Sequence, residues 1–474
     1  MEKISSISRK RGHRAIFQKK PVEQFLKERE KSTLNKNLGV KDLTSLGVGG
    51  IIGAGIFVLT GIAAAHYAGP AIAVSFAIAG FLCIFVRLSY SEFASMILAS
   101  GNVYSYTLAS LGEGFAFLCG WSLLLAYTVT GSAVAVGFSG YLAGVLKSYG
   151  WIIPDILLKT PAEGGLINLP AVLNVLVVAA VLIRGTEQSA KLNFALVLVT
   201  LSAIITFGCI AAPHAQTANL EPFAPFGVKG ILSGAAIVFF SYMGFDAVAS
   251  SAGECKDPEN SLPIGIIFSV MICMCLYIAI ALSLTAAVNY TQLDTPEPVV
   301  YVLRLLGWEK VANLIVVGAI EGIITTLIVY LFGQSRVFFA ISRDGMLPKK
   351  MGKIHPKYHT PYLVTAAGDL MIAGIAGFVP LMHIVELSNT GTLVVFLVNF
   401  INLIVMRRKH PEVPRKFRCP ALYIVAPLGI AVCFYLIYEL STLTHILFAA
   451  WTLLGLVVYE TYGVKHSSLN TEPE

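Results

Sequence analysis

The sequence predicts an all-α membrane protein with twelve transmembrane helices, two of which are discontinuous. Three observations lead to this prediction: the composition, the number of long apolar runs, and glycine-rich interruptions inside two of them. The chain has 474 residues, of which 56% are hydrophobic and 13% are charged, whereas a soluble domain usually carries about 25% charged residues. This deficit of charge excludes an ordinary soluble protein.

The apolar runs are long enough to cross a bilayer, since a transmembrane helix needs about 20 mainly apolar residues. The twelve predicted spans are Leu43–Ala65, Ala71–Leu98, Phe115–Leu146, Ile167–Ile183, Leu192–Ala212, Ile231–Ser251, Ile264–Val288, Val311–Ile341, Pro361–Val379, Ile384–Met406, Leu422–Leu440 and Leu443–Tyr462.

The basic residues gather in the even-numbered connections and in the N-terminal tail. The connections after spans eight and ten hold Arg336, Arg343, Lys349, Lys350, Lys353, Lys357, Arg407, Arg408, Lys409, Arg415, Lys416 and Arg418. The positive-inside rule therefore places both tails, 1–42 and 463–474, in the cytoplasm of a multi-pass protein of the plasma or bacterial inner membrane. The net charge of +7 follows this loop pattern, so it does not indicate a nucleic-acid partner.

Two spans contain residues that weaken a helix. In the first span, the segment Gly49–Phe57 holds four glycines among residues 49–55, and each glycine costs about 1 kcal/mol relative to alanine inside a helix. The second interruption is Phe240–Asp246 in the sixth span. Unwound backbone is tolerated in a membrane only where protein shields it or where it lines a cavity. The two breaks therefore predict a substrate site near the membrane midplane.

The breaks also indicate an internal repeat. Each break opens a set of five spans, 43–212 and 229–406. Because five is odd, the second set starts from the opposite side of the membrane, so the halves are inverted. Spans eleven and twelve, within 420–462, lie outside the repeat.

Five motifs, in order along the chain, resemble those of the amino acid–polyamine–organocation superfamily. They are Gly50-Ile51-Ile52-Gly53-Ala54-Gly55-Ile56-Phe57, Phe239-Phe240-Ser241-Tyr242-Met243-Gly244-Phe245-Asp246, Glu254-x-x-Asp257-Pro258, Gly333-Gln334-Ser335-Arg336 and Ser342-Arg343-Asp344-Gly345-Met346-Leu347-Pro348. Together they look most like the cationic amino acid transporter branch and its bacterial amino acid permease relatives. The resemblance implies a LeuT-like 5+5 inverted repeat and a secondary active amino acid transporter that works by alternating access.

The resemblance also implies how the breaks bind a zwitterion. A helix N-terminus offers N–H groups to a carboxylate, and a helix C-terminus offers carbonyls to an ammonium group. The carboxylate site maps to Ala54 and Gly55, and the ammonium site maps to the carbonyls of Ile51, Phe240, Ser241 and Met243. Phe240 and Tyr242 are the expected gating aromatics. The alternative is that these glycines only permit close helix packing.

The coupling ion is left open between H⁺ and Na⁺, as is uniport or exchange. Asp246 matches an acid that pairs, in proton-coupled relatives, with a tyrosine equivalent to Tyr277; its alternative role is a helix cap. Thr200 stands where such relatives often carry a lysine, and its hydroxyl is a candidate Na⁺ ligand.

Two residues of span eight point to the substrate's side chain. Tyr330 aligns with a pocket-shaping position of the family and favours a small or medium neutral substrate. Glu321 is nine residues earlier, about 13.5 Å along the helix and roughly 180° around it, so the two are not expected to share one pocket. We expect Glu321 to pair with a basic or polar group between helices; the alternative is attraction of a cationic side chain. In span two, Arg87 and Glu92 are expected to form a local ion pair.

Three other functions are alternatives to neutral amino acid transport: transport of cationic amino acids or polyamines, reception without transport, and enzyme activity. A cationic amino acid or polyamine uniporter or exchanger would need more acids in the pocket, and a receptor without transport usually adds a soluble signalling domain. A nucleophile–base pair, metal-ligand spacing or phosphate loop is not evident, so we expect no enzyme activity, metal or cofactor. An unknown small membrane partner stays open.

Overall fold

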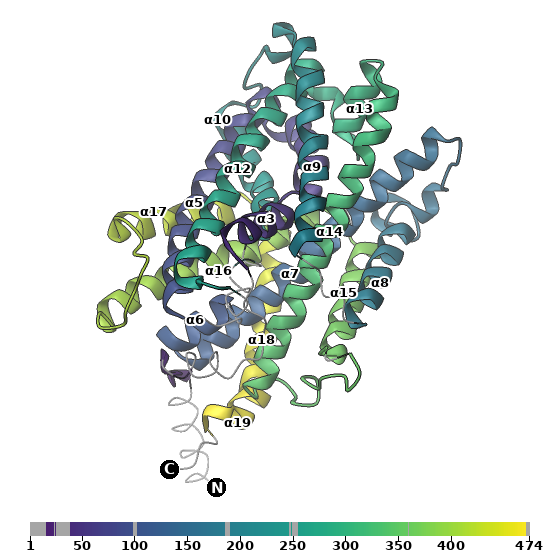
Figure 1. Ribbon diagram of the computed structural model, residues 1–474. Coiled ribbons are helices and arrows are strands. Elements are labelled where there is room, and N and C mark those ends of the chain that lie inside the picture. Colours follow the sequence, from purple (N-terminus) through teal and green to yellow (C-terminus); the bar gives the residue numbers. More distant parts are fainter. Residues whose placement is uncertain are drawn as a thin grey trace.

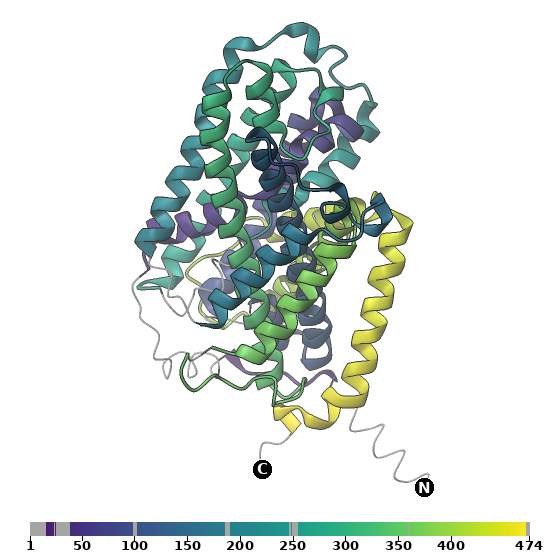
Figure 2. The same ribbon diagram turned by 90° about the vertical axis from the view of Figure 1, so that its right-hand side faces the viewer.

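The computed structural model describes residues 16–22, 24, 38–97, 102–184, 190–245, 248, 255–358 and 360–470. Within them the chain is an elongated bundle of long helices (Figures 1 and 2), and the only β pairing is an isolated bridge between Leu38 and Cys255. The prediction of an all-α protein is confirmed for this part of the chain.

The first helical segment, α3, spans Val40–Ile51 and is followed by a π-helical turn, Gly55–Leu59, a short helix α4, Thr60–Ala63, and a second π-helical turn, Ala64–Ala68. The remaining helices in chain order are α5 (Ile72–Met96), α6 (Asn102–Ser110), α7 (Glu113–Ser148), α8 (Leu169–Ile183), α9 (Ala190–Ala211), α10 (Gly227–Val238), α12 (Pro258–Ala287), α13 (Pro298–Leu305), α14 (Glu309–Arg343), α15 (Tyr362–Phe378), α16 (Leu381–Lys409), α17 (Leu422–Tyr438), α18 (Thr442–Val458) and α19 (Val464–His466).

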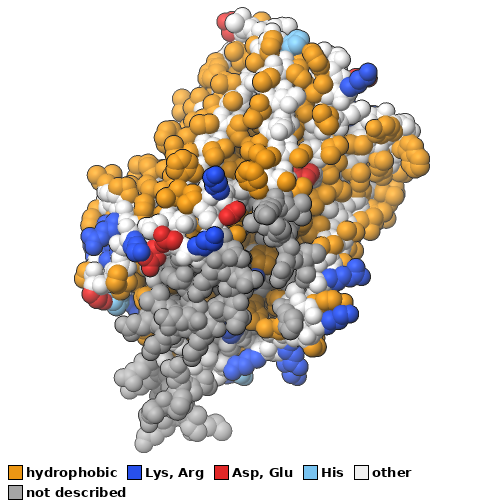
Figure 3. Space-filling model, in the orientation of Figure 1, with side chains coloured by type: hydrophobic (Ala, Val, Ile, Leu, Met, Phe, Trp, Pro, Cys, Tyr) orange, Lys and Arg blue, Asp and Glu red, His pale blue; other side chains and the backbone are white. Residues whose placement is uncertain are grey.

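Among the described residues, seven helical runs are long and apolar enough to cross a membrane. The first of these runs, Val40–Met96, covers 57 residues, and four further apolar helices are shorter, with 10–17 residues. Figure 3 shows hydrophobic side chains over the upper part of one face and most of that face's Lys and Arg side chains toward its lower end. A multi-pass membrane protein is therefore confirmed.

Two packing groups bring the broken segments to the centre of the bundle. Helix α12 packs along both α5 and α3, while α7 packs along α14 and α16. Helix α14 also contacts α3 and α9, so α3 packs against helices from distant parts of the chain (Figure 1). This arrangement shields the interrupted backbone from lipid, as unwound membrane segments require.

The predicted ion pair between Arg87 and Glu92 is wrong. Glu92 is fully buried and accepts hydrogen bonds from Arg407, with Nη2 at 2.6 Å, and from the backbone N–H of Cys419 at 2.8 Å. Arg415 Nε lies 3.3 Å from its other oxygen. Residues five apart on a helix are separated by roughly 140°, so Arg87 and Glu92 face different neighbours.

Both ends of the described chain meet at one end of the bundle. The Gln18 side chain donates from Nε2 to the backbone carbonyl of Leu469 at 2.7 Å. The backbone carbonyl of Gln18 accepts from the N–H of Glu113 at 2.9 Å. Lys20 Nζ lies 3.9 Å from Asp344, next to the end of α14 and the basic connection that follows it. Of the predicted N-terminal tail, 1–42, the structure describes residues 16–22, 24 and 38–42.

Candidate functional site

The first break lies at Ile52 and Gly53. Helix α3 ends at Ile51, and Ile52 then adopts an extended conformation with φ −79° and ψ 101° before helical structure resumes. The Val48 carbonyl still accepts the N–H of Ile52 at 2.9 Å, but the carbonyls that follow it in the last turn of α3 lack the partners that a continuous helix provides. The predicted glycine-weakened segment contains this interruption.

The second break follows α10. A 3₁₀ turn, Phe239–Tyr242, leads to an extended Met243 with ψ 163°, and Gly244 has a φ of +102°. Glycine is the residue that adopts this φ without steric cost. Asp246, the predicted coupling acid of this segment, lies outside the described residues.

The two breaks lie in direct contact. A Cβ on Gly55 would sit 2.5 Å from the Cα of Ser241, and a Cβ on Gly50 would sit 2.9 Å from the carbonyl oxygen of Gly244. The glycines thus permit close packing, as the packing interpretation required. The helices that they bring together are the interrupted ones, and binding of a ligand by these breaks stays a prediction.

Hydroxyl groups from two other helices bind the carbonyls exposed at the breaks. The Tyr277 hydroxyl, on α12, lies 2.9 Å from the carbonyl oxygens of both Ile51 and Ser241. Thr326, on α14, has its hydroxyl 3.2 Å from the carbonyls of Gly49 and Ile52. Two predicted ammonium-binding carbonyls therefore converge on one phenol hydroxyl.

The other predicted binding residues are buried around this contact. The Phe240 carbonyl accepts the N–H of Met243 at 3.2 Å, and Ala54 lies beside Gly137 of α7. The Ser241 hydroxyl is buried without a hydrogen-bond partner among the described residues. Ser241 thus presents a satisfied carbonyl and an unsatisfied hydroxyl at the junction of the breaks.

A cavity lies beside the second break. Its lining is largely aromatic and aliphatic and, among the described residues, includes five hydroxyl-bearing side chains but no charged one. The lining residues are Tyr90, Leu123, Tyr127, Thr130, Met243, Gly244, Phe245, Tyr330, Thr392 and Phe396. Tyr330 is thus brought to the second break, as predicted for a pocket residue.

The thioether of Met243 is the polar centre of that cavity wall. Its Sδ accepts hydroxyl contacts from Ser388 at 3.4 Å, Thr392 at 3.5 Å and Thr130 at 3.7 Å. Thr130 and Ser388 also hydrogen bond to each other. These contacts hold the side chain of Met243, the extended residue of the second break, in place.

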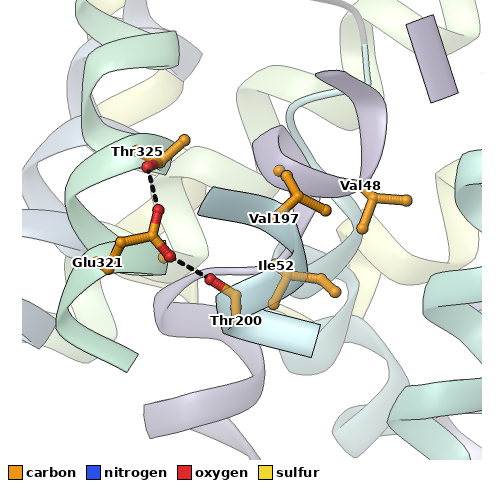
Figure 4. Close-up of a pocket in the computed structure, with 8 residues that line it drawn as sticks. Val48, Ile52, Val197, Thr200, Glu321 and Thr325 are labelled. Carbon is orange, nitrogen blue, oxygen red and sulfur yellow. Dashed lines mark hydrogen bonds between the residues drawn. The ribbon is translucent and has the colours of Figure 1, made fainter. Parts of the chain in front are cut away.

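A separate cavity lies between α3, α9 and α14 (Figure 4). The Glu321 carboxylate accepts a hydrogen bond of 2.5 Å from Thr200 and one of 2.9 Å from Thr325, while Val48, Gly49, Ile52 and Val197 complete the wall. The expected pairing of Glu321 with a polar group between helices is confirmed, and its partner is another predicted coupling residue. Glu321 and Tyr330 line different cavities, as their spacing predicted.

The two predicted gating aromatics do not line either described cavity. Tyr242 is fully buried and donates its hydroxyl to the carbonyl of Phe76 at 2.8 Å. Phe240 is also buried, with 4% of its surface exposed. Their gating role stays a prediction.

Comparison with known proteins matches residues 38–458 to the amino acid permease family. The chain belongs to this family. A methylthioribose transporter and the branched-chain amino acid permease BcaP, both of Bacillus subtilis, are each 41% identical over 96% of this chain and 99% of their own length. A vacuolar cationic amino acid transporter of Arabidopsis thaliana is 34% identical over 80% of this chain and 64% of its own length. The predicted superfamily is confirmed.

Sequence reasoning missed two residues that contact the breaks. Thr326 gave no signal, because a threonine in an apolar helix usually bonds its own backbone. Arg87 was noticeable in the sequence, since an arginine in a membrane span is costly, but the sequence led to the prediction of an ion pair with the nearby Glu92. The structure instead places its guanidinium at the second break.

Proposed function

We propose that this permease is a secondary active transporter that binds a neutral amino acid at the two helix breaks. The observation that carries the proposal is the direct contact of the breaks, with the Ile51 and Ser241 carbonyls converging on Tyr277. Alternating access between two states of this site moves the substrate across the membrane. The family and its named relatives are transporters, which supports transport rather than enzyme chemistry.

The zwitterion supplies the two charges that the broken helices complement. The substrate ammonium binds the carbonyls of Ile51, Phe240, Ser241 and Met243, and its carboxylate binds the N–H groups of Ala54 and Gly55. The Tyr277 hydroxyl lies within hydrogen-bond distance of two of these carbonyls, which share its single hydrogen. A bound ammonium group therefore has to share these acceptors with Tyr277 or displace its hydroxyl.

The side chain of the substrate occupies the cavity beside Met243 and Tyr330. The described residues of the lining are all uncharged, and against them a cationic side chain would lose its hydration without a counter-charge. This favours a small or medium neutral amino acid over a cationic amino acid or a polyamine. The similarity to a branched-chain amino acid permease supports the same choice.

We further propose twelve membrane crossings in two inverted sets of five, with the breaks in the first helix of each set. The run Val40–Met96 is long enough for two crossings and bends at Gly69, where φ is +61°. With that run counted twice, the long and short apolar helices together number twelve. The basic connection after α14 lies beside both described chain ends, which supports cytoplasmic termini in a cell membrane.

We propose that the coupling ion is a proton carried by Glu321. The carboxylate lies in the cavity that touches the last turn of α3 and is held by two hydroxyl groups. Gaining or losing a proton changes its charge and reverses the hydrogen-bonding role of one oxygen. Gly49 and Ile52 also line this cavity, so a change in the protonation of Glu321 acts directly on the first break.

A second candidate substrate is methylthioribose, which a 41% identical relative transports by name. The hydroxyl-bearing lining residues Tyr90, Tyr127, Thr130, Tyr330 and Thr392 favour a neutral ligand that carries hydroxyl groups. Such a ligand has neither an ammonium nor a carboxylate group. It would place no charged group at the N–H groups and carbonyls of the two breaks.

Uptake into liposomes containing the purified protein tests the proposal. Labelled leucine, alanine, arginine and methylthioribose are offered with a proton gradient, with a sodium gradient, and with neither. We expect leucine or alanine to enter faster than arginine, with stimulation by the inward proton gradient. Uptake of methylthioribose alone would replace the substrate proposal with the second candidate, and sodium-dependent uptake would overturn the proton proposal.

A further inference from the structure

Arg87 is a fully buried arginine in the middle of α5. An arginine inside a membrane span is costly and commonly has a functional partner. Arg87 lies too far around the helix from Glu92 to pair with it, and Glu92 is bound by Arg407. Its position therefore needs another explanation.

The guanidinium contacts the second break directly. Nη2 donates to the carbonyl of Tyr242 at 3.1 Å, and Nη1 lies 3.4 Å from the carbonyl of Ile266 on α12. The guanidinium carbon lies 3.7 Å from the centre of the Phe245 ring. Arg87 thus joins α5, α12 and the residues on both sides of Gly244.

We propose that Arg87 is the positioning residue that holds the second break in its substrate-binding shape. The Tyr242 carbonyl belongs to the 3₁₀ turn before the break, and Phe245 follows the left-handed Gly244. Holding both fixes the turn between them, which contains Met243. The inference rests on the proposed binding of a substrate at this break.

The contact extends from Arg87 to the cavity wall. Phe245 lines the cavity and packs against Tyr90, at 5.1 Å between ring centres, and against Phe396, at 5.4 Å. Tyr90 lies one helical turn after Arg87, on the same side of α5. The cavity-lining ring of Phe245 therefore contacts both the guanidinium of Arg87 and two aromatic cavity residues, Tyr90 and Phe396.

Lysine cannot reproduce these contacts. A guanidinium is planar, stacks on an aromatic ring and donates in several fixed directions at once, whereas an ammonium group is a compact point charge. Arg87→Lys keeps the positive charge but loses the stacking and the fork of donors. This substitution separates the charge of Arg87 from its geometry.

The test compares Arg87→Lys, Phe245→Leu and the double variant in liposomes, with labelled leucine as the probe. We expect Arg87→Lys to raise the KM for leucine by roughly tenfold, equivalent to about 1.4 kcal/mol, with a smaller change in the maximal rate. The double variant should raise KM by less than the product of the single effects, because both remove the same contact. Arg408→Lys is the matched control, since Arg408 is exposed and faces the Tyr423 ring at 5.7 Å.

Hydrogen exchange of the detergent-purified protein provides a readout that needs no transport. The peptide containing Phe239–Phe245 should exchange faster in Arg87→Lys than in the wild type and the Arg408 control. Wild-type KM and unchanged exchange in a folded Arg87→Lys protein would overturn the inference. If the wild type transports no leucine, the proposed function fails, and the exchange result alone then decides whether Arg87 shapes the break.

Discussion

Tyr330 is the residue on which the proposed size limit of the substrate depends most directly. It is 3% exposed and lines the cavity together with Met243 and Gly244. Its ring lies 6.1 Å from the ring of Tyr127, another wall residue. A smaller side chain at this position enlarges the cavity without removing a charged group.

The variant Tyr330→Ser should therefore accept larger neutral amino acids, such as phenylalanine and tryptophan, while binding leucine less tightly. Loss of a buried aromatic side chain also lowers stability, by about 3–5 kcal/mol for a full truncation to alanine, so the folded fraction is measured first. Competition of each amino acid with labelled leucine uptake reports the change. Tyr438→Ser, at a side chain that is 77% exposed, is the control. An unchanged order of competitors would contradict the assignment of Tyr330 to the pocket.

The elements at the centre of the molecule are the two interrupted helices, and their contact depends on glycine. Gly55 faces the backbone of Ser241 and Gly53 faces the side chain of Thr326. A methyl group at Gly55 would have to displace backbone, which cannot move aside as a flexible side chain can. The contact is therefore intolerant of even the smallest side chain.

Gly55→Ala should abolish leucine transport although alanine is the better helix former. The Cβ would meet the Cα of Ser241 at 2.5 Å, which forces the two breaks apart and separates the carboxylate site from the ammonium site. Gly374→Ala, in α15, is the matched control because a Cβ there meets nothing within 4 Å. That control should keep transport and gain up to about 1 kcal/mol in stability. Normal transport by Gly55→Ala would show that the breaks need not touch.

The sequence predicted these elements well because local chemistry determines them. Four glycines in the first span located its interruption, and the second interruption falls at the predicted residues around Met243 and Gly244. The partners of the breaks were harder to predict, because Tyr277, Thr326 and Arg87 reach them from helices distant in sequence. Tyr277 was named only through a resemblance and for a different partner, Asp246. Arg87 was paired with its neighbour along the chain, although helix geometry turns the two apart.

At the scale of the whole molecule, transport requires that the ion site and the substrate site change together. The cavity of Glu321 and the proposed substrate site share the first break, since Ile52 lines the cavity and the Ile51 carbonyl is a proposed substrate ligand. Thr326, on the same helix as Glu321, binds the carbonyls of Gly49 and Ile52. In the proposed mechanism, a change in the charge of Glu321 therefore acts on the proposed substrate carbonyls through the end of α3.

Glu321→Gln should separate coupling from movement of the substrate. Because glutamine carries no titratable proton, an inward proton gradient should no longer drive leucine accumulation, while exchange of labelled for unlabelled leucine continues. Glu309→Gln, at an exposed position at the start of α14, should behave as the wild type. Gradient-driven accumulation by Glu321→Gln would exclude Glu321 as the carrier of the coupling proton.

Competition by analogues that lack one charge tests the central claim most directly. Labelled leucine uptake is measured in the presence of leucine, leucine methyl ester, 4-methylpentanoate or methylthioribose. Since the ester lacks the carboxylate and 4-methylpentanoate lacks the ammonium group, binding at both broken helices predicts that only leucine competes strongly. Competition by either analogue at the same concentration as leucine would contradict recognition of the zwitterion by the two breaks.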